Sequence, residues 1–226
     1  MTKKKEAKSK ISTKNGDIFR IQPNELQKQV INFIRTNEIT LLSGESGTGK
    51  DTCCLFRGLD GLIKKEFEKM LIIRPIVESS SSKLGFLKGD LSEKTNPYEQ
   101  FYFDHLNKML NKVELTRVKS KIEFEVCNFV RGKSFEYSYI IVSEAQSFRL
   151  EELMTIVTRL SSSSKIVFNF DPMQSDIGNK SGIKDFIKIL EGVDGADYMH
   201  LGAEYQMRNP MIVQINKNYR DFLASK

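Results

Sequence analysis

Residues 39–50 read Ile-Thr-Leu-Leu-Ser-Gly-Glu-Ser-Gly-Thr-Gly-Lys, and this stretch decides the fold that the sequence predicts. Its apolar start predicts a short buried strand, and a glycine-rich loop and a helix follow directly. Gly47 and Gly49 let the backbone bend so that its N–H groups point at phosphate oxygens, and the helix N-terminus adds partial positive charge. Because the loop stands between a strand and a helix, the sequence predicts a phosphate-binding loop (P-loop) rather than an ordinary glycine-rich turn.

The residues of this loop are the expected contacts of a nucleotide. They are Gly44, Glu45, Ser46, Gly47, Thr48, Gly49, Lys50, Asp51 and Thr52. Lys50 is expected to reach the β- and γ-phosphates. The residue after such a lysine is usually Ser or Thr, whose hydroxyl holds Mg²⁺, whereas this chain has Asp51. A carboxylate is also a good ligand for a hard cation, so ATP and Mg²⁺ remain the predicted ligands.

A second motif stands at residues 140–146, which read Ile-Ile-Val-Ser-Glu-Ala-Gln. It resembles the Walker B strand of helicase-like ATPases, in which hydrophobic residues precede Asp-Glu-Ala-Gln. In that resemblance Glu144 polarises the attacking water, while Ser143 stands where the pattern has an aspartate. A strand that ends in a polar turn is common by itself, so this motif depends on the glycine loop upstream.

A third motif, Phe-Asp-Pro-Met-Gln-Ser-Asp at residues 170–176, follows another predicted strand. It resembles the Gly-Asp-x-x-Gln motif of superfamily 1 helicases, with Phe170 in place of the glycine. In that resemblance Gln174 senses the γ-phosphate. An isolated Asp-Pro turn has no functional meaning, and it is the position at a strand end after Glu144 that favours a function.

The composition bounds the class of protein. The chain has 226 residues, a formal net charge of +6 and 39% hydrophobic residues, which predicts one α/β domain with its own core. Short apolar strands alternate with helical segments, so we expect a parallel sheet with helices on both faces. No run of about 20 apolar residues, no secretory signal and an odd number of cysteines without zinc spacing favour a cytoplasmic protein that does not enter a membrane.

The predicted division of the chain is a basic flexible tail at residues 1–17 and a P-loop NTPase domain at residues 18–226. Six of the first 14 residues are lysines, against one acid, Glu6. Such a segment is either an arm attracted to nucleic-acid phosphates or a solvated tail. The absence of aromatic residues that would stack on bases favours the solvated tail.

Taken together, the motifs resemble the PhoH-like ATPase family, which is related to the superfamily 1 helicase core. The resemblance spans about residues 23–223, and its most family-specific part is Leu-Gly-Phe-Leu-Lys-Gly-Asp at residues 84–90. It implies a RecA-like P-loop NTPase core. It also implies that Gln27 reads adenine and that Arg208 is an arginine finger or γ-phosphate sensor. Two plain alternatives stay open, namely Gln27 as a solvated surface residue and Arg208 as an arginine at a helix start.

The function that the resemblance implies is Mg²⁺-dependent ATP hydrolysis. It also allows coupling to RNA or another single-stranded nucleic acid, with residues 75–95 as the loop that would face it. One core leaves the nucleotide open on one side, so we expect a homo-oligomer, with a hexamer-like ring as the form in the family. The alternatives are a nucleotide-binding module with little or no hydrolysis and, ranked lower, a nucleotide kinase. His105 and His200 are interpreted as ordinary histidines of the surface or core.

The two departures at the metal site suggest a specific hypothesis. Asp51 places a carboxylate where the hydroxyl belongs, and Ser143 places a hydroxyl where the carboxylate belongs. We interpret this as a reciprocal swap that keeps one carboxylate and one hydroxyl at Mg²⁺ and allows a hydrogen bond between them. The plain alternative is two independent losses in a decaying ATPase.

Overall fold

The structure is a computed structural model that describes residues 18–75, 91–207 and 210–224. The tail predicted at residues 1–17, most of the loop at residues 75–95, and Arg208 lie outside the described residues.

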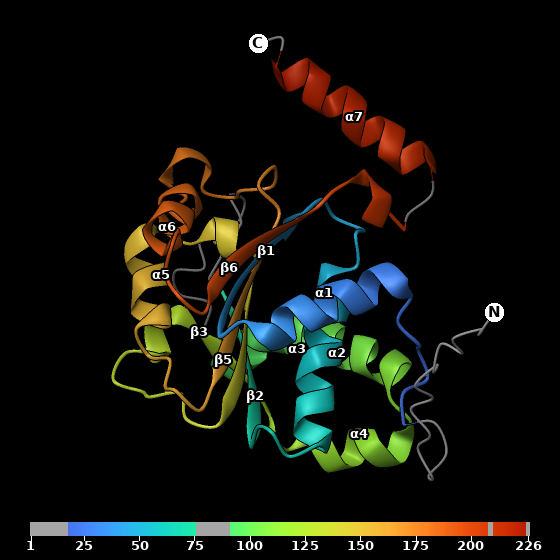
Figure 1. The fold of residues 1–226 in the computed structure, drawn as a ribbon, viewed down its shortest axis with the longest axis vertical. Helices are drawn as coiled ribbons and strands as arrows, with labels where there is room; N and C mark the ends of the chain where they lie inside the picture. The colour runs from blue at the N-terminus through green and yellow to red at the C-terminus, as the bar shows by residue number, and fades with distance from the viewer. Residues whose placement is uncertain (1–17, 76–90, 208–209, 225–226) are drawn as a thin grey trace, which may run out of the picture.

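Six parallel strands form a single sheet (Figure 1). They are β1 (Ile39–Gly44), β2 (Lys69–Arg74), β3 (Ile122–Val126), β4 (Ser138–Ser143), β5 (Lys165–Phe170) and β6 (Ala196–Leu201). Their order in the sheet is β3-β2-β4-β5-β1-β6. The glycine loop follows β1 and the Glu144 motif follows β4, so β5 lies between the two strands that carry them. Because all strands are parallel, the three motifs meet at the carboxyl-terminal ends of the strands.

Helices cover both faces of this sheet, as the sequence predicts (Figure 1). One face packs against α1 (Glu25–Thr36), α2 (Lys50–Ile63), α3 (Leu91–Met109) and α4 (Lys112–Lys119), and the other against α5 (Leu150–Val157) and α6 (Ile183–Leu190). Neighbouring residues of β4 show the two faces, because Ile141 belongs to the first apolar cluster and Ile140 to the second. The predicted fold class, an α/β P-loop core, is confirmed.

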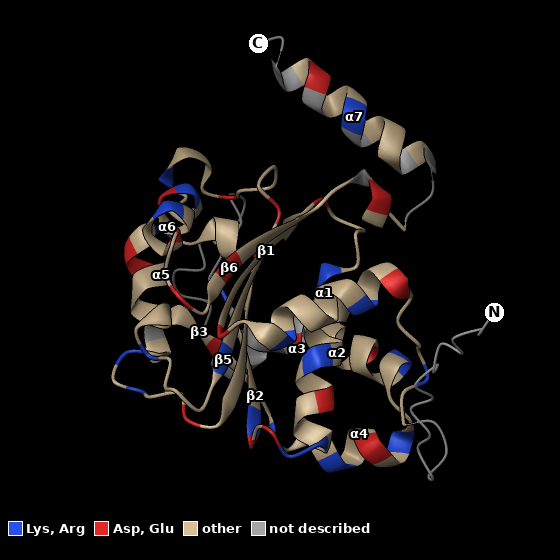
Figure 2. Ribbon diagram, viewed as in Figure 1, with Lys and Arg blue, Asp and Glu red and all other residues tan. Residues whose placement is uncertain are grey.

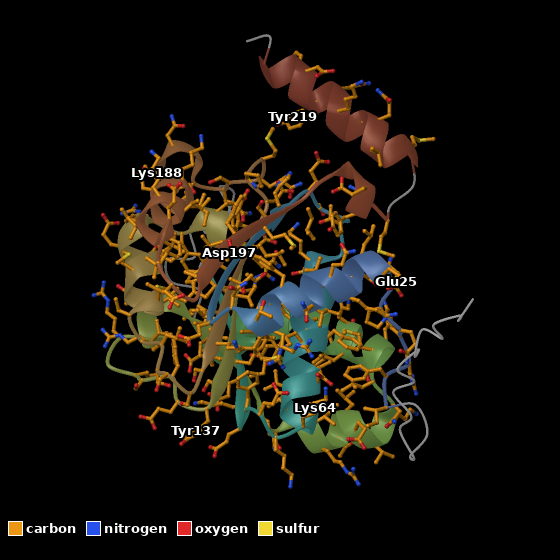
Figure 3. All side chains as sticks on the ribbon, viewed as in Figure 1. Glu25, Lys64, Tyr137, Lys188, Asp197 and Tyr219 are labelled. Atoms are coloured by element: carbon orange, nitrogen blue, oxygen red, sulfur yellow. The ribbon has the colours of Figure 1, made fainter. Side chains whose placement is uncertain are left out.

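The last helix, α7 (Pro210–Ala224), extends away from the sheet (Figure 1). Tyr219, which Figure 3 labels on this helix, is 56% exposed. Along the outer helices α4 and α6, Lys and Arg alternate with Asp and Glu (Figure 2), and pairs such as Arg117 with Glu114 lie three residues apart. Such exposed pairs contribute little to stability. Among the described residues, no helix combines the length and apolar character that a membrane span requires.

The sequence did not predict two elements of the fold, β6 and α4. The strand β6 has the alternating sequence Ala-Asp-Tyr-Met-His-Leu and lies at the edge of the sheet, where most of its residues stay accessible to solvent. The helix α4 has few apolar residues, of which only Val118 is buried. Both therefore lack the apolar runs by which the central strands and the buried helices are recognised.

Candidate active site

The glycine loop turns from β1 into α2 through left-handed backbone conformations. Gly47 has φ 96° and Gly49 has φ 82°, a region that residues with a side chain rarely adopt. Gly49 is the N-cap of α2, and Lys50 is its first residue. The 14-residue helix α2 therefore begins directly at the loop. Its first N–H groups have no partner within the helix and are suited to an anion.

Lys50 is held over this loop by main-chain oxygens. Its Nζ donates to the carbonyl oxygen of Gly44 at 2.5 Å and to that of Glu45 at 3.0 Å, and only 7% of the residue is exposed. Burial lowers the pKa of Lys50, while the negative charges of Asp51 and Asp171 act in the opposite direction. Carbonyl oxygens of the loop are partners that an ammonium group can exchange for phosphate oxygens.

A cavity of about 330 Å³ opens beside the loop, within the size range of ligand pockets. Besides the loop and the first turn of α2, its described lining consists of side chains from α3, from the ends of β4 and β5, and from the segment after β6. These residues are Phe101, His105, Glu144, Asn169, Phe170, Asp171, Gln174 and Met207. The cavity therefore brings the three sequence motifs together.

Glu144 follows β4 in a left-handed conformation, with φ 55° and ψ 42°. This conformation is uncommon for a residue with a long side chain, and such outliers often occur at functional sites. The Glu144 side chain is 44% exposed, and its carboxylate lies 4.0 Å from Nη2 of Arg74. A carboxylate at the rim of the cavity with access to solvent can accept a proton from, or orient, a water molecule there.

Gln146 connects the β4 and β5 motifs, and only 1% of it is exposed. Its Nε2 donates to the Glu144 carboxylate at 2.7 Å and to the main-chain oxygen of Gln174 at 2.8 Å. Its Oε1 accepts from the backbone N–H of Asp171 at 3.1 Å. One side chain thus fixes the carboxylate of Glu144 relative to the turn that carries Gln174, whose own side chain is exposed and lines the cavity.

Asp171 holds the glycine loop from the neighbouring strand. Its carboxylate accepts from the backbone N–H of Ser46 at 2.9 Å and from that of Met173 at 3.0 Å. The residue is 6% exposed. The end of β5 therefore anchors the loop, a contact that the motif at residues 170–176 did not predict.

Asp51 and Ser143 have different partners. Asp51 accepts a hydrogen bond of 2.6 Å from Nδ2 of Asn169 on β5. Ser143 interacts instead with Tyr102 of α3. Burial, reinforced by the charge of Asp51, raises the pKa of Tyr102, and the interaction with Ser143 acts against that shift. The described residues contain no hydrogen bond between Asp51 and Ser143.

The donors near Asp51 suit a hard cation. Asp51, Thr52 and Glu144 line the same cavity and offer oxygen ligands, which Mg²⁺ prefers. Within the part of the chain that the structure describes, no group of three or more His, Cys, Asp and Glu residues is placed to hold an ion. Mg²⁺ is commonly bound by one or two carboxylates together with phosphates and water, so these residues fit an ion that arrives with a nucleotide.

Helix α3 forms one wall of the cavity, which sequence reasoning missed. The Nε2 atom of His105 lies 3.2 Å from the hydroxyl of Thr52. Burial lowers the pKa of His105, and the charge of Asp51 opposes this shift. Phe101, one turn earlier, is 53% exposed at the same cavity. His105 is thus in contact with the helix that follows the glycine loop and lines the cavity.

Gln27 is buried, with 8% exposure, and is not a solvated surface residue. It forms a capping box with Asn24, whose backbone N–H donates to Oε1 at 3.0 Å. Its Nε2 lies 3.5 Å from the sulfur of Met207. Met207 lines the cavity, and its backbone N–H donates to the Gly47 carbonyl oxygen at 3.1 Å. Met207 therefore lies next to the amide that the resemblance assigns to adenine.

The other histidine takes part in a small polar cluster. Nδ1 of His200 lies 2.8 Å from the hydroxyl of Ser43, which is also 2.7 Å from the hydroxyl of Tyr198. Ser43 precedes the glycine loop, and His200 is its direct neighbour on β6. His200 is absent from the cavity lining, so it links the edge strand to β1.

Comparison with known proteins identifies relatives over most of the chain. A sequence model of the family described as PhoH-like protein matches residues 20–220. A PhoH-like protein of Synechocystis is 31% identical over 92% of this chain and 64% of its own length. A PhoH-like protein of Bacillus subtilis is 30% identical over 85% of this chain and 61% of its own length. The chain therefore spans about three fifths of the length of these two relatives.

Among solved structures, a similar one is that of Bacteroides Pif1 bound to single-stranded DNA. The TM-score is 0.41 and the sequence identity 17%, over 89% of this chain and 47% of that protein.

Proposed function

The chain belongs to the PhoH-like protein family, and from this premise we propose that it is a P-loop NTPase that binds ATP with Mg²⁺ and hydrolyses the γ-phosphate. The observation that carries the proposal is the carboxylate of Glu144, which shares one cavity with Lys50 and is oriented by Gln146. A phosphate-binding loop alone would support binding only. A solvent-accessible carboxylate at the same cavity is the group that hydrolysis needs in addition.

In the proposed mechanism, the loop N–H groups and the N-terminus of α2 bind the phosphates. Lys50 exchanges the carbonyl oxygens of Gly44 and Glu45 for phosphate oxygens. Glu144 orients a water molecule and accepts its proton, while Gln146 holds the carboxylate in place. Catalysis of phosphoryl transfer rests mainly on such positioning and on charge stabilisation.

As part of the same proposal, Asp51 and Ser143 would hold Mg²⁺, and the hydroxyl of Thr52 is a further oxygen donor next to Asp51. When bound, the ion would neutralise charge on the phosphate oxygens. The support from the chain is the set of oxygen donors beside Lys50, together with the 2.6 Å hydrogen bond that fixes the Asp51 carboxylate.

We further propose that the protein acts as a homo-oligomer with Arg208 reaching a nucleotide on a neighbouring subunit. Of the described residues that line the cavity, none is an arginine, although a guanidinium group is what stabilises the transition state in many NTPases. Coupling to RNA or another single-stranded nucleic acid is part of the proposal as a property that the family resemblance suggests.

The test is to measure binding of a fluorescent ATP analogue and phosphate release in parallel, with and without single-stranded RNA. Binding together with release that Glu144→Gln slows would support the proposed hydrolysis. Binding without release above that of Lys50→Ala would favour the alternative of a nucleotide-binding module. Transfer of the phosphate to a nucleoside monophosphate instead of water would favour a nucleotide kinase.

A further inference from the structure

Asn169 lies near the carboxyl end of β5, between the strand ends that carry the glycine loop and Glu144. None of the three sequence motifs includes it. It lies on β5, directly beside Ser143 of β4 and Leu42 of β1. Only 4% of the residue is exposed, and it lines the cavity. Its Nδ2 donates to Asp51 at 2.6 Å across a sequence separation of 118 residues.

The chemistry of the pair fixes the orientation of the amide. A carboxylate accepts hydrogen bonds, so the nitrogen of Asn169 and not its oxygen must face Asp51. This orientation turns Oδ1 away from the carboxylate. Oδ1 of Asn169 is fully buried and has no hydrogen-bond partner. Buried acceptors are almost always satisfied in folded proteins, so the contact of Nδ2 with Asp51 is kept although it leaves Oδ1 without a partner.

Ser143 does not supply this partner, although it is the neighbour of Asn169 in the sheet. Its hydroxyl is engaged by Tyr102, which is itself only 1% exposed. Asn169, which contacts Asp51, therefore belongs to β5. This strand lies directly beside β1, which leads into the glycine loop, whereas β4, which leads to Glu144, lies one strand further away.

We propose that Asn169 is the positioning residue of the metal site, which holds the carboxylate of Asp51 in place through Nδ2. The proposal rests on the proposed function, because the ion is expected to arrive with ATP. Groups that orient a metal ligand typically change metal affinity roughly 10–100-fold when they are removed.

Two substitutions with opposite electrostatic consequences test this role. Asn169→Leu removes the donor and the acceptor. The factor by which Mg²⁺ strengthens binding of the fluorescent ATP analogue should therefore be at least about 10-fold smaller than in the wild type. Asn169→Asp keeps the shape but adds a second carboxylate beside Asp51, and like charges in such contact repel each other unless a cation is present. Asn169→Asp should weaken binding of the analogue in EDTA and increase the factor by which Mg²⁺ strengthens that binding.

The measurement is the ratio of the dissociation constants of the analogue in EDTA and in saturating MgCl₂, with a thermal melt of each variant. A merely structural role would shift this ratio in the same direction for both variants or leave it unchanged, and either result overturns the proposal. If Asn169→Leu does not fold, Asn169→Ala, which removes the same Nδ2 donor with a smaller side chain, takes its place. Wild-type protein that does not bind the analogue would contradict the proposed function itself, which is a distinguishable result.

Thr40→Val provides the matched control. The Thr40 hydroxyl is also buried without a partner, on β1, the other neighbour of β5. It lies towards the opposite end of the sheet, away from the cavity lining. The ratio for Thr40→Val should equal that of the wild type, and an equal shift in this variant would show that any change in a buried polar group of the sheet alters Mg²⁺ dependence.

Discussion

The side-chain amide nitrogen of Gln146 lies 2.7 Å from the carboxylate of Glu144, two residues before it in the chain. The left-handed backbone of Glu144 ends β4 and leads directly into the short 3-10 turn Ala145–Ser147 that carries Gln146. The backbone turn therefore directs the carboxylate, and the amide holds it. This pair is the part of the site on which hydrolysis is expected to depend most.

We expect Glu144→Gln to retain ATP binding and to slow hydrolysis by about 10²–10⁴-fold, the usual contribution of a general base. The substitution keeps the size of the side chain and removes its ability to accept a proton. Phosphate release at saturating ATP measures the rate, and titration of the fluorescent analogue measures binding. An unchanged rate would mean that another group activates the water.

Gln146→Leu should slow hydrolysis although Glu144 is still present. The change also removes the acceptor for the backbone N–H of Asp171, and leaving a buried donor without a partner costs about 1–3 kcal/mol. Chemical denaturation measures the free energy of unfolding, and phosphate release measures the rate. Gln100→Leu is the control, because Gln100 is exposed and its Nε2 donates to Asp104 one turn later on α3. Full activity in Gln146→Leu would show that Glu144 needs no such support.

Lys50→Ala should weaken ATP binding and abolish hydrolysis. Lys50 is the only lysine that lines the cavity among the described residues, so no other ammonium group there replaces its charge on the phosphates. The protein should remain folded, because the present partners of Lys50 are loop carbonyl oxygens that solvent can reach once the side chain is removed. Wild-type turnover in this variant would place catalysis outside the glycine loop.

The sequence predicts the three motifs because each is local. A strand, a loop and a helix in succession are visible in residues 39–50, and a parallel arrangement then brings the ends of β4 and β5 to the same edge. The contacts between motifs are not local. Asn169 contacts Asp51, and Tyr102 contacts Ser143, although the partners are far apart in the sequence. Hydrophobic periodicity does not predict such contacts. For this reason the wall formed by α3 and the anchoring of the loop by β5 could be found only in the structure.

The role proposed for Arg208 predicts complementation between subunits. Arg208→Ala and Lys50→Ala should each be inactive alone, because one lacks the finger and the other lacks the phosphate-binding lysine. In a mixed oligomer, a subunit with an intact loop can receive the finger from a neighbour with an intact Arg208. Mixing the two variants should therefore restore part of the phosphate release. No recovery, together with a monomer by light scattering in the presence of ATP, would contradict a finger that acts between subunits.

The hypothesis of a reciprocal swap between Asp51 and Ser143 can be tested by a double-mutant cycle. Asp51→Ser leaves no carboxylate from this pair and should weaken binding of Mg²⁺ and ATP. Ser143→Asp places two carboxylates at the site, which repel each other when Mg²⁺ is absent. The double variant restores one carboxylate and one hydroxyl. Its affinity should return close to that of the wild type, with an interaction energy of about 0.5–3 kcal/mol.

The structure adds a condition to this cycle. Because no direct hydrogen bond joins Asp51 and Ser143 in the described residues, we expect the coupling to pass through a shared neighbour. Asn169 contacts Asp51 and lies beside Ser143 on the adjacent strand, so its Nδ2 can serve a carboxylate at either position. Repeating the cycle with Asn169→Leu in all four proteins should therefore remove the interaction energy. Simple additivity in the original cycle, or higher activity in Asp51→Ser alone, would instead indicate two independent losses. Coupling that persists without Asn169 would mean that the two side chains communicate through the ion itself.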